Sequence, residues 1–469
     1  MASSRKHVLC VSVPAYGHLI PLLELARKLA QHHQITFAVS KKAAGELEGR
    51  ELYNPTVDGD TIQLHAIEDG MMDDLDDPND VGIFDRTLPL IFDGITKLVE
   101  NVPTKNAKDS KVNGISTPVD MIIADFFLGH EATKMAAERH IPLLIFIAGR
   151  ANIVPMALSF TEEVRQKLEA MKGSSNPGHG GFLVAPKENG SLLEAPPEHV
   201  VKHILIPQHK AFPLATGFIV NSLRKYEQKY IDQCEAMVQM KGKPMYCVGP
   251  LLADGKTKTT NLETEEKVRS WLETKQAASV VYICFGSVAT PKPEQLKEIG
   301  RTILQLNQPV IWSLKKNKHG HLPEEVKAAA QIDFGGEGNA DKNILILSWA
   351  PQKMILAQPN VALFVSHCGW NSTIEGLHQG KPIVAWPQFA DQMMNGDFVE
   401  EIGAGVVVRD AGLMSTRLVS AEEFSSKVQA ALSKKEGAVS VGKCIAAVWA
   451  EGGSSLTDYR SLLSFIGTC

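Results

Sequence analysis

The chain has 469 residues, of which 44% are hydrophobic and 22% charged, and its formal net charge is −5. That length predicts two or three domains, and the charge gives no reason to expect nucleic acid or an anionic membrane as partner. No apolar run reaches the roughly 18 residues of a membrane span, and residues 8–13 are too short for a signal-peptide core. The seven cysteines, with no Cys-x-x-Cys, predict free and mostly buried thiols in a cytoplasmic protein.

Short apolar segments that are typical of buried strands alternate with helical patterns along the chain. In the first half these segments are residues 7–13, 35–39, 121–124, 143–147 and 217–220, and residues 19–30 form the first amphipathic helix. In the second half they are residues 279–284, 310–314, 344–347, 362–365, 382–386 and 405–408. Strands of this length separated by helices predict parallel sheets covered on both faces. The fold class is therefore α/β, with two doubly wound, Rossmann-like domains.

The domain boundary is predicted near residues 248–250, because a polar stretch, 254–264, follows it. We expect a cleft between the two domains, with ligands at the carboxyl ends of the strands that face it. Residues 172–197 are rich in Gly, Pro, Ser and Asn and are expected to form a long mobile excursion of the first domain.

Near its N-terminus the chain places a histidine between a strand and a helix. His18 follows the strand over 7–13 and lies at the entry to the first helix. The dipole of that helix disfavours a positive imidazolium, so the ring should stay neutral and able to accept a proton. A carboxylate partner would orient the ring, and Asp125 ends the strand 121–124 at its carboxyl end. Asp120, at the opposite end, is the poorer candidate.

The segment 349–392 is the most informative part of the chain. Trp349 is followed by an Ala-Pro pair, which favours an extended backbone at Ala350. Its indole could be exposed and stack on uracil, or it could be a core tryptophan before a turn. After the strand over 362–365 the chain turns sharply at 367–370 and enters a helix at Asn371. The N–H groups and the dipole at that helix start suit a diphosphate and need no metal.

Two further features of this segment allow more than one interpretation. Ser372 and Glu375 have the spacing of a capping box, which is a purely structural device, but Glu375 could instead accept hydrogen bonds from ribose hydroxyls. Asp391 and Gln392 place a carboxylate next to a carboxamide, a pair that can bind several sugar hydroxyls but is also common on protein surfaces.

Segment 349–392 resembles the signature segment of the UDP-dependent glycosyltransferases of small molecules, best known from plants. The Pro-Ala-Tyr-Gly-His at 14–18 resembles their catalytic-base motif, and the apolar tail after 452 also matches. The resemblance implies the two-domain GT-B fold. It places an acceptor-binding domain over 1–248, a UDP-sugar-binding domain over 249–450 and a C-terminal helix, within 451–469, that packs back on the first domain.

The resemblance also implies the chemistry. We expect inverting transfer of a hexose, most often glucose, from a UDP-sugar to a hydroxyl of a small hydrophobic acceptor such as a phenol, by a monomer without metal or other cofactor. His18 would be the general base, oriented by Asp125. The implied donor-binding residues are Ser287, Trp349, Ala350, Gln352, His367, Gly369, Trp370, Asn371, Ser372, Glu375, Asp391 and Gln392. The acceptor pocket is predicted from Tyr16, Phe126, Phe127 and Phe389.

Three positions depart from the family pattern. Gln358 stands where the family usually has His, and Ile147 stands where it often has a hydroxyl residue that touches the sugar. His130 replaces a commonly aromatic residue. The Asp-x-Asp at residues 74–76 resembles a metal motif of a different glycosyltransferase fold, but the acidic run around it is more typical of a solvated loop.

Two other functions fit the same architecture. A nucleotide-sugar epimerase would consume a UDP-sugar without an acceptor, and a non-catalytic sugar-nucleotide sensor would bind it without turnover. The sensor would leave the coincidence of His18 and Asp125 unexplained. Neither Gly403-Ala-Gly405 nor the Gly-Glu-Gly at 336–338 has the strand–helix context of a dinucleotide site.

Overall fold

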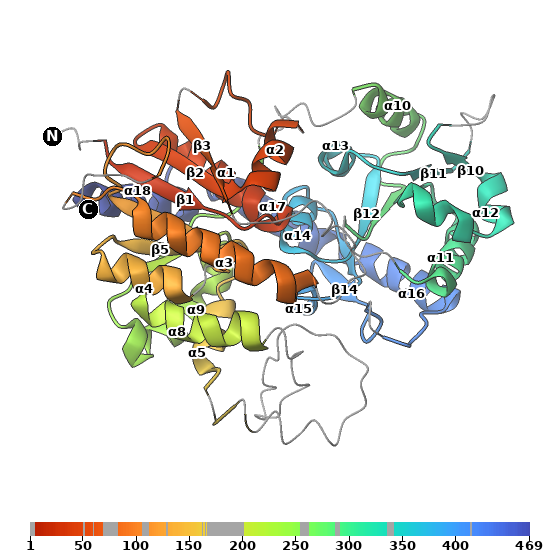
Figure 1. Ribbon diagram of the computed structural model, residues 1–469. Coiled ribbons are helices and arrows are strands. Elements are labelled where there is room, and N and C mark those ends of the chain that lie inside the picture. Colours follow the sequence, from red (N-terminus) through yellow and green to blue (C-terminus); the bar gives the residue numbers. More distant parts are fainter. Residues whose placement is uncertain are drawn as a thin grey trace. The chain divides into compact units, whose positions relative to one another are not determined.

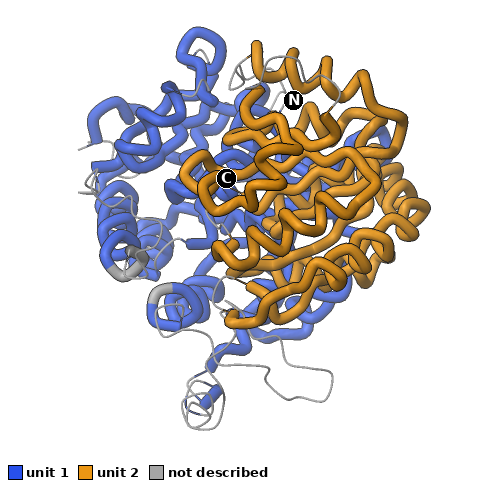
Figure 2. Tube along the Cα trace, turned by 90° about the vertical axis from the view of Figure 1, so that its right-hand side faces the viewer, with its two compact units in different colours: residues 1–173, 197–259, 448–469 blue, residues 174–196, 260–447 orange. Residues whose placement is uncertain are grey.

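The computed structural model divides the chain into two compact units (Figure 2). Unit 1 comprises residues 1–173, 197–259 and 448–469, and unit 2 comprises residues 174–196 and 260–447. The residues that the structure describes are 5–49, 52–59, 61–68, 83–105, 112–127, 130–161, 163–164, 166, 201–253, 262–286, 291–334, 342–412 and 415–469.

Unit 1 is built on a seven-stranded sheet whose order is β3-β2-β1-β4-β5-β6-β7, with every pair parallel. Its strands are β1 (His7–Val11), β2 (Gln34–Ser40), β3 (Ile62–Ile67), β4 (Met121–Asp125), β5 (Leu143–Ile147), β6 (Gly217–Val220) and β7 (Met245–Cys247). Its α-helices are α1 (Tyr16–Ala30), α2 (Lys41–Gly49), α3 (Ile83–Asn101), α4 (His130–Glu138), α5 (Ile153–Ser159), α8 (Ile206–Ala211), α9 (Arg224–Glu235) and α18 (Ser454–Thr468). Shorter helical turns are η2 (Val201–Leu205), η3 (Phe212–Leu214) and η4 (Val238–Met240).

Both faces of this sheet are covered, as the apolar strands require. Alternate strand residues such as Cys10, Phe37 and Ile123 pack on one face against Leu22 of α1 and Leu462 of α18. Helix α3 contacts α4, α4 contacts α8, and α8 contacts α5, so these four helices form a separate layer (Figure 1). The last helix of the chain is therefore part of the core of unit 1.

Unit 2 repeats this plan with a second parallel sheet in the order β10-β11-β9-β8-β12-β13-β14. Its strands are β8 (Val280–Cys284), β9 (Val310–Ser313), β10 (Ala330–Ile332), β11 (Ile344–Leu347), β12 (Val361–Ser366), β13 (Ile383–Ala385) and β14 (Gly405–Val407). Its helices are α10 (Leu262–Glu273), α11 (Pro293–Gln305), η5 (Lys316–His321), α12 (Glu324–Ala329), α13 (Gln352–Ala357), α14 (Trp370–His378), α15 (Gln392–Glu401), α16 (Ala421–Leu432) and α17 (Lys435–Ala447).

In unit 2, too, every second residue of a strand points to the same face of the sheet. Residues such as Ile283, Trp312 and Val365 pack on one face with Leu296 of α11 and Phe424 of α16. Helices α13, α14 and α15 follow β11, β12 and β13 directly, and they contact β12, β13 and β14. The carboxyl ends of the central strands therefore lead straight into the helices that carry the predicted donor residues.

The predicted fold class is confirmed: both sheets are parallel and flanked by helices. Three strands were not predicted, namely β3, β7 and β10, and each lies at the edge of its sheet. Gly405 begins β14, in agreement with the strand predicted there. The predicted excursion over 172–197, the acidic residues 74–76 and the glycines 336–338 lie outside the described residues.

All seven cysteines are free thiols, as predicted, and four of them are buried. Burial raises the pKa of each of these four thiols to about 12, which keeps them protonated and unreactive at neutral pH. The four are Cys10, Cys234, Cys247 and Cys368.

Candidate active site

In unit 1 the structure brings His18 and Asp125 together. The strands β1 and β4 are neighbours, so the residues that follow β1 meet the end of β4 at one edge of the sheet. His18 Nδ1 lies 2.8 Å from Asp125 Oδ2, and Phe127 N donates to Asp125 Oδ1 over 2.9 Å. Because a carboxylate only accepts, Nδ1 carries the hydrogen, which leaves Nε2 of the neutral ring as a proton acceptor.

Aromatic rings surround this histidine. The Phe126 ring stacks on it with centroids 5.3 Å apart and 27° between planes, and the Phe127 ring lies at 5.0 Å. The His18 side chain remains 20% exposed while that of Asp125 is 2% exposed. The pair therefore combines a buried carboxylate with a reachable imidazole in apolar surroundings.

Two residues that the sequence did not indicate, Glu46 and Gln208, bind the neighbours of His18. Tyr16 Oη donates a hydrogen bond to Glu46 Oε2 on α2, which fixes the tyrosine. Gln208 Nε2 on α8 donates to the Phe126 carbonyl over 3.3 Å. Neither polar residue lies in a local motif, so no sequence signal pointed to them.

In unit 2, Trp349 is 50% exposed. This is unusual for a tryptophan in this protein, whose large aromatic side chains are mostly buried. It follows β11, and the preceding Ser348 is bound twice by Asp333, which lies just beyond β10. Ser348 N donates to Asp333 Oδ1 over 2.7 Å, and Ser348 Oγ donates to Asp333 Oδ2. We call this pair of bonds the Asp333–Ser348 clamp. Ala350, next to the tryptophan, is buried.

A network of side-chain hydrogen bonds joins α13, which follows this tryptophan segment, to α14. Gln352 Nε2 donates to Glu375 Oε2 over 2.7 Å and to Ser372 Oγ over 3.1 Å, and the buried Tyr282 hydroxyl lies 3.4 Å from Gln352 Oε1. Burial raises the pKa of the Glu375 carboxyl, and Lys353 and the bond from Gln352 offset this in part. The carboxylate is thus held in one orientation by groups from α13.

The turn before α14 has the backbone of an anion site. Cys368 has a φ of +60°, and Gly369, which has no side chain to cap the helix, is the N-cap of α14. The first-turn N–H groups of Trp370, Asn371 and Ser372 precede the first intrahelical bond, from Thr373 N to Gly369 O. The capping box predicted as one alternative is wrong, because the helix begins at Trp370 and Ser372 lies inside it.

His367 lies packed against two glycines at this turn. A Cβ added at Gly286 would lie 2.7 Å from His367 Nε2, and one added at Gly369 would lie 2.8 Å from it. Burial lowers the pKa of His367 to about 4, so the ring is neutral at pH 7. The Trp370 indole is buried against Phe398, at 5.7 Å, which places this ring in the core.

The predicted sugar-binding pair lies at the start of α15. Asp391 is the N-cap residue, and its Oδ2 accepts from Asn395 Nδ2 over 2.8 Å. Gln392 is buried, and its Oε1 accepts from Gln388 N and Phe389 N over 2.9 and 3.2 Å. Both side chains are therefore fixed by their own turn. Ser287 lies outside the described residues.

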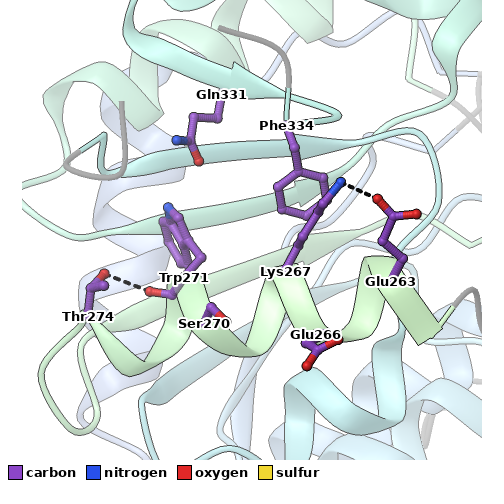
Figure 3. A pocket seen from close by; sticks show the side chains of 8 residues that line it. All are labelled: Glu263, Glu266, Lys267, Ser270, Trp271, Thr274, Gln331 and Phe334. Carbon is purple, nitrogen blue, oxygen red and sulfur yellow. Dashed lines mark hydrogen bonds and ion pairs between the residues drawn. The ribbon is translucent and has the colours of Figure 1, made fainter. Parts of the chain in front are cut away.

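A surface pocket of about 630 Å³ lies elsewhere in unit 2, between α10 and β10 (Figure 3). Five of its residues lie on α10 and one just beyond the end of that helix, and the other two lie on β10 and just beyond it. It is lined by Glu263, Glu266, Lys267, Ser270, Trp271, Thr274, Gln331 and Phe334. None of the predicted site residues lines this pocket.

Among the residues that the structure describes, no three His, Cys, Asp or Glu side chains are grouped as metal ligands. Within the same residues, no helix combines the length and apolar character needed to cross a bilayer.

The chain is similar to known proteins along its whole length. Residues 250–432 match the family model described as UDP-glucoronosyl and UDP-glucosyl transferase. UDP-glycosyltransferase 73E1 of Stevia rebaudiana is 27% identical over 97% of this chain and 95% of its own length. UDP-glycosyltransferase 72E1 of Arabidopsis thaliana is 28% identical over 93% of this chain and 90% of its own length.

Solved structures agree on the fold. The Medicago truncatula UGT71G1 structure, complexed with UDP-glucose, has a TM-score of 0.79 at 22% identity, over 99% of both chains. A UDP-glucosyltransferase from Polygonum tinctorium that glucosylates indoxyl has a TM-score of 0.73 at 22% identity and covers both chains fully. The family match over residues 250–432, the relatives and the shared fold agree: the chain is similar to plant UDP-glycosyltransferases and is a UDP-sugar glycosyltransferase.

Proposed function

We propose that the enzyme transfers glucose from UDP-glucose, with inversion at the anomeric carbon, to a hydroxyl group of a small hydrophobic acceptor such as a phenol. The observation that carries the proposal is the 2.8 Å contact between His18 Nδ1 and Asp125 Oδ2. It supports a neutral imidazole with its Nε2 ready to take a proton, beside aromatic rings suited to an apolar acceptor.

The proposed reaction is a single displacement. His18 Nε2 removes the proton of the acceptor hydroxyl as its oxygen attacks the anomeric carbon of the sugar. The bond from that carbon to the diphosphate oxygen breaks, and UDP leaves from the opposite side. Asp125 orients the ring and stabilises the imidazolium that forms. Tyr16, Phe126, Phe127 and Phe389 are proposed to surround the acceptor.

The donor is proposed to bind to unit 2. Trp349 stacks on uracil, Glu375 accepts from the ribose hydroxyls, and the start of α14 with His367 holds the diphosphate. Asp391 and Gln392 bind glucose hydroxyls; Gln at this position usually accompanies glucose donors in the family that the segment resembles. The UDP-glucose in the Medicago relative is consistent with this donor. Residues 1–248 and 249–450 would thus serve acceptor and donor respectively.

One assay separates this proposal from its alternatives. The protein is incubated with UDP-glucose, with and without a panel of phenols, and the products are analysed by mass spectrometry. A hexose adduct that requires the phenol supports the proposal. An altered sugar nucleotide formed without acceptor would indicate an epimerase, and binding without turnover would indicate a sensor.

The role of His18 has its own test. His18→Ala should lower kcat by about 10²- to 10⁴-fold, the usual contribution of general-base catalysis, and leave the Kd for UDP-glucose unchanged. Asp125→Asn, which can present a donor to Nδ1, should also lower kcat. A near-wild-type rate for His18→Ala on an oxygen acceptor would show that His18 is not the base.

A further inference from the structure

We propose that Asn395, on α15, is a positioning residue that ties the hexose-binding carboxylate to the diphosphate-binding turn. Its side-chain amide donates two hydrogen bonds, one to Asp391 Oδ2 over 2.8 Å and one to the Cys368 carbonyl over 2.9 Å. One planar group thereby joins two segments that are proposed to hold different parts of the donor. This inference rests on the proposed binding of UDP-glucose.

The amide is well placed to act as a rigid link. Asn395 is 2% exposed, so water does not compete for either bond. Its neighbour Gly396 lets α15 approach β13 closely, since an added Cβ would lie 3.3 Å from the Cβ of Ala385. Asn395 therefore cannot move away without moving the whole helix.

The bond to Cys368 fixes a peptide plane in the anion site. In a trans peptide the C=O and N–H groups point in opposite directions. A donor held on the Cys368 carbonyl therefore points the Gly369 N–H away from Asn395. Cys368 has a φ of +60°, a sparsely populated conformation that needs such support from its surroundings.

The bond to Asp391 fixes the carboxylate that is proposed to bind glucose. Asp391 is the N-cap residue of α15, but its side chain accepts no capping hydrogen bond from the helix backbone. Its Oδ2 is instead held by Asn395, four residues later on the same helix. The bond is thus not required to begin the helix, and a role toward the ligand is the simplest explanation for it.

The test compares ligands that reach different distances into the site. The Kd values of uridine, which carries no phosphate, and of UDP-glucose are measured by calorimetry for the wild type, Asn395→Leu and the isosteric Asn395→Asp at pH about 8. Both variants should weaken UDP-glucose by about 10- to 100-fold, the effect of losing hydrogen bonds to charged or buried groups. The affinity for uridine, which is held by Trp349 and Glu375, should change by less than about twofold.

The pH dependence of Asn395→Asp gives a readout that a purely structural role would not give. The new carboxyl would lie beside Asp391, so one proton is shared by the pair at mildly acidic pH and restores one donor. The UDP-glucose affinity of this variant should therefore recover between about pH 8 and pH 5, whereas that of the wild type should not rise. Asp397→Asn, on the exposed side of α15, is the matched control and should leave both ligands unaffected.

The outcomes are distinct. Failure of the wild type to bind UDP-glucose would refute the proposed function. If the wild type binds it, unchanged UDP-glucose affinity in both Asn395 variants would overturn the inference. Equal weakening of uridine and UDP-glucose would also overturn it, because that pattern indicates a general disturbance of the unit.

Discussion

At the scale of single residues, two histidines show how surroundings decide a role. His18 meets a buried carboxylate at Nδ1, which fixes its tautomer, and its side chain is 20% exposed. His367 has no carboxylate beside it among its described contacts, and burial lowers its pKa to about 4. The first arrangement suits proton transfer. The second keeps a neutral ring that donates a hydrogen bond without adding a charge.

The lowered pKa of His367 predicts a pH effect on stability. Below about pH 6.5 the unfolded chain binds a proton at this ring, but the folded protein does not until about pH 4. The free energy of unfolding should therefore fall as the pH falls, by roughly 2 kcal/mol from this group between about pH 7 and pH 5. Urea unfolding of the wild type and of His367→Gln at both pH values measures it.

Other titrating groups are common to both proteins and cancel in this comparison. The wild type should lose stability relative to His367→Gln as the solution becomes acidic. Parallel pH profiles of the two proteins would show that His367 titrates normally in the folded state.

At the scale of elements, the carboxyl ends of the strands carry the candidate site. Asp125 ends β4, the Trp349 segment follows β11, and the anion-site turn follows β12. Such ends are predictable, because a buried parallel strand is apolar on both faces and stands out in the sequence. The edge strands β3, β7 and β10 escaped prediction for the opposite reason. They are short or partly polar, with Gln63 and His65 inside β3.

The Asp333–Ser348 clamp joins two of these elements and predicts an effect on nucleotide binding. Trp349→Ala should weaken UDP binding by about 1–3 kcal/mol, the value of base stacking on an aromatic ring. Ser348→Ala removes one bond of the clamp and should weaken UDP by a smaller amount, because the indole stays but is less well oriented. Calorimetric titration with UDP measures both changes.

Ser433→Ala is the matched control for the clamp, since the hydroxyl of this exposed serine also donates a hydrogen bond, to the Ala430 carbonyl, but lies at the end of α16. It should bind UDP like the wild type. Unchanged UDP affinity in Trp349→Ala would count against the whole donor assignment. Unchanged affinity in Ser348→Ala alone would count only against a role of the clamp in orienting the indole.

At the scale of the whole molecule, the chain returns to its first unit at its end. Asp458 on α18 accepts from Cys247 N over 2.7 Å and from Arg224, and Tyr459 Oη donates to the Lys28 carbonyl over 2.7 Å. Leu462 is fully buried in the core of unit 1. The C-terminal helix therefore stabilises the unit that carries His18.

This arrangement predicts a local effect of a mutation in the helix. Leu462→Ala should cost about 2–5 kcal/mol, the range for emptying a buried leucine site. The loss should fall on unit 1, so hydrogen exchange should quicken in β1 and β4 while β8 and β12 keep their protection. Ser461→Ala, on the exposed side of α18, is the control. Equal loss of protection in both sheets would show that the two cores unfold as one.

The sequence by itself determined the fold class and pointed to the candidate site residues, because both depend on short-range patterns. Apolar runs mark buried strands, Trp349 precedes an Ala-Pro pair, and Gly369 lies in the turn between a strand and a helix. The tertiary structure decided which residues meet. His18 and Asp125 lie 107 positions apart and touch because β1 and β4 are neighbours in the sheet.

The tertiary structure also decided which residues support the candidate site. Asp333, Gln208 and Asn395 are ordinary polar residues in the sequence, and only the packing of their helices and strands gives them partners. The physical reason is that a hydrogen bond requires two groups within about 3 Å with the correct direction. Strand order and helix packing set that geometry, and no local pattern of residues records it.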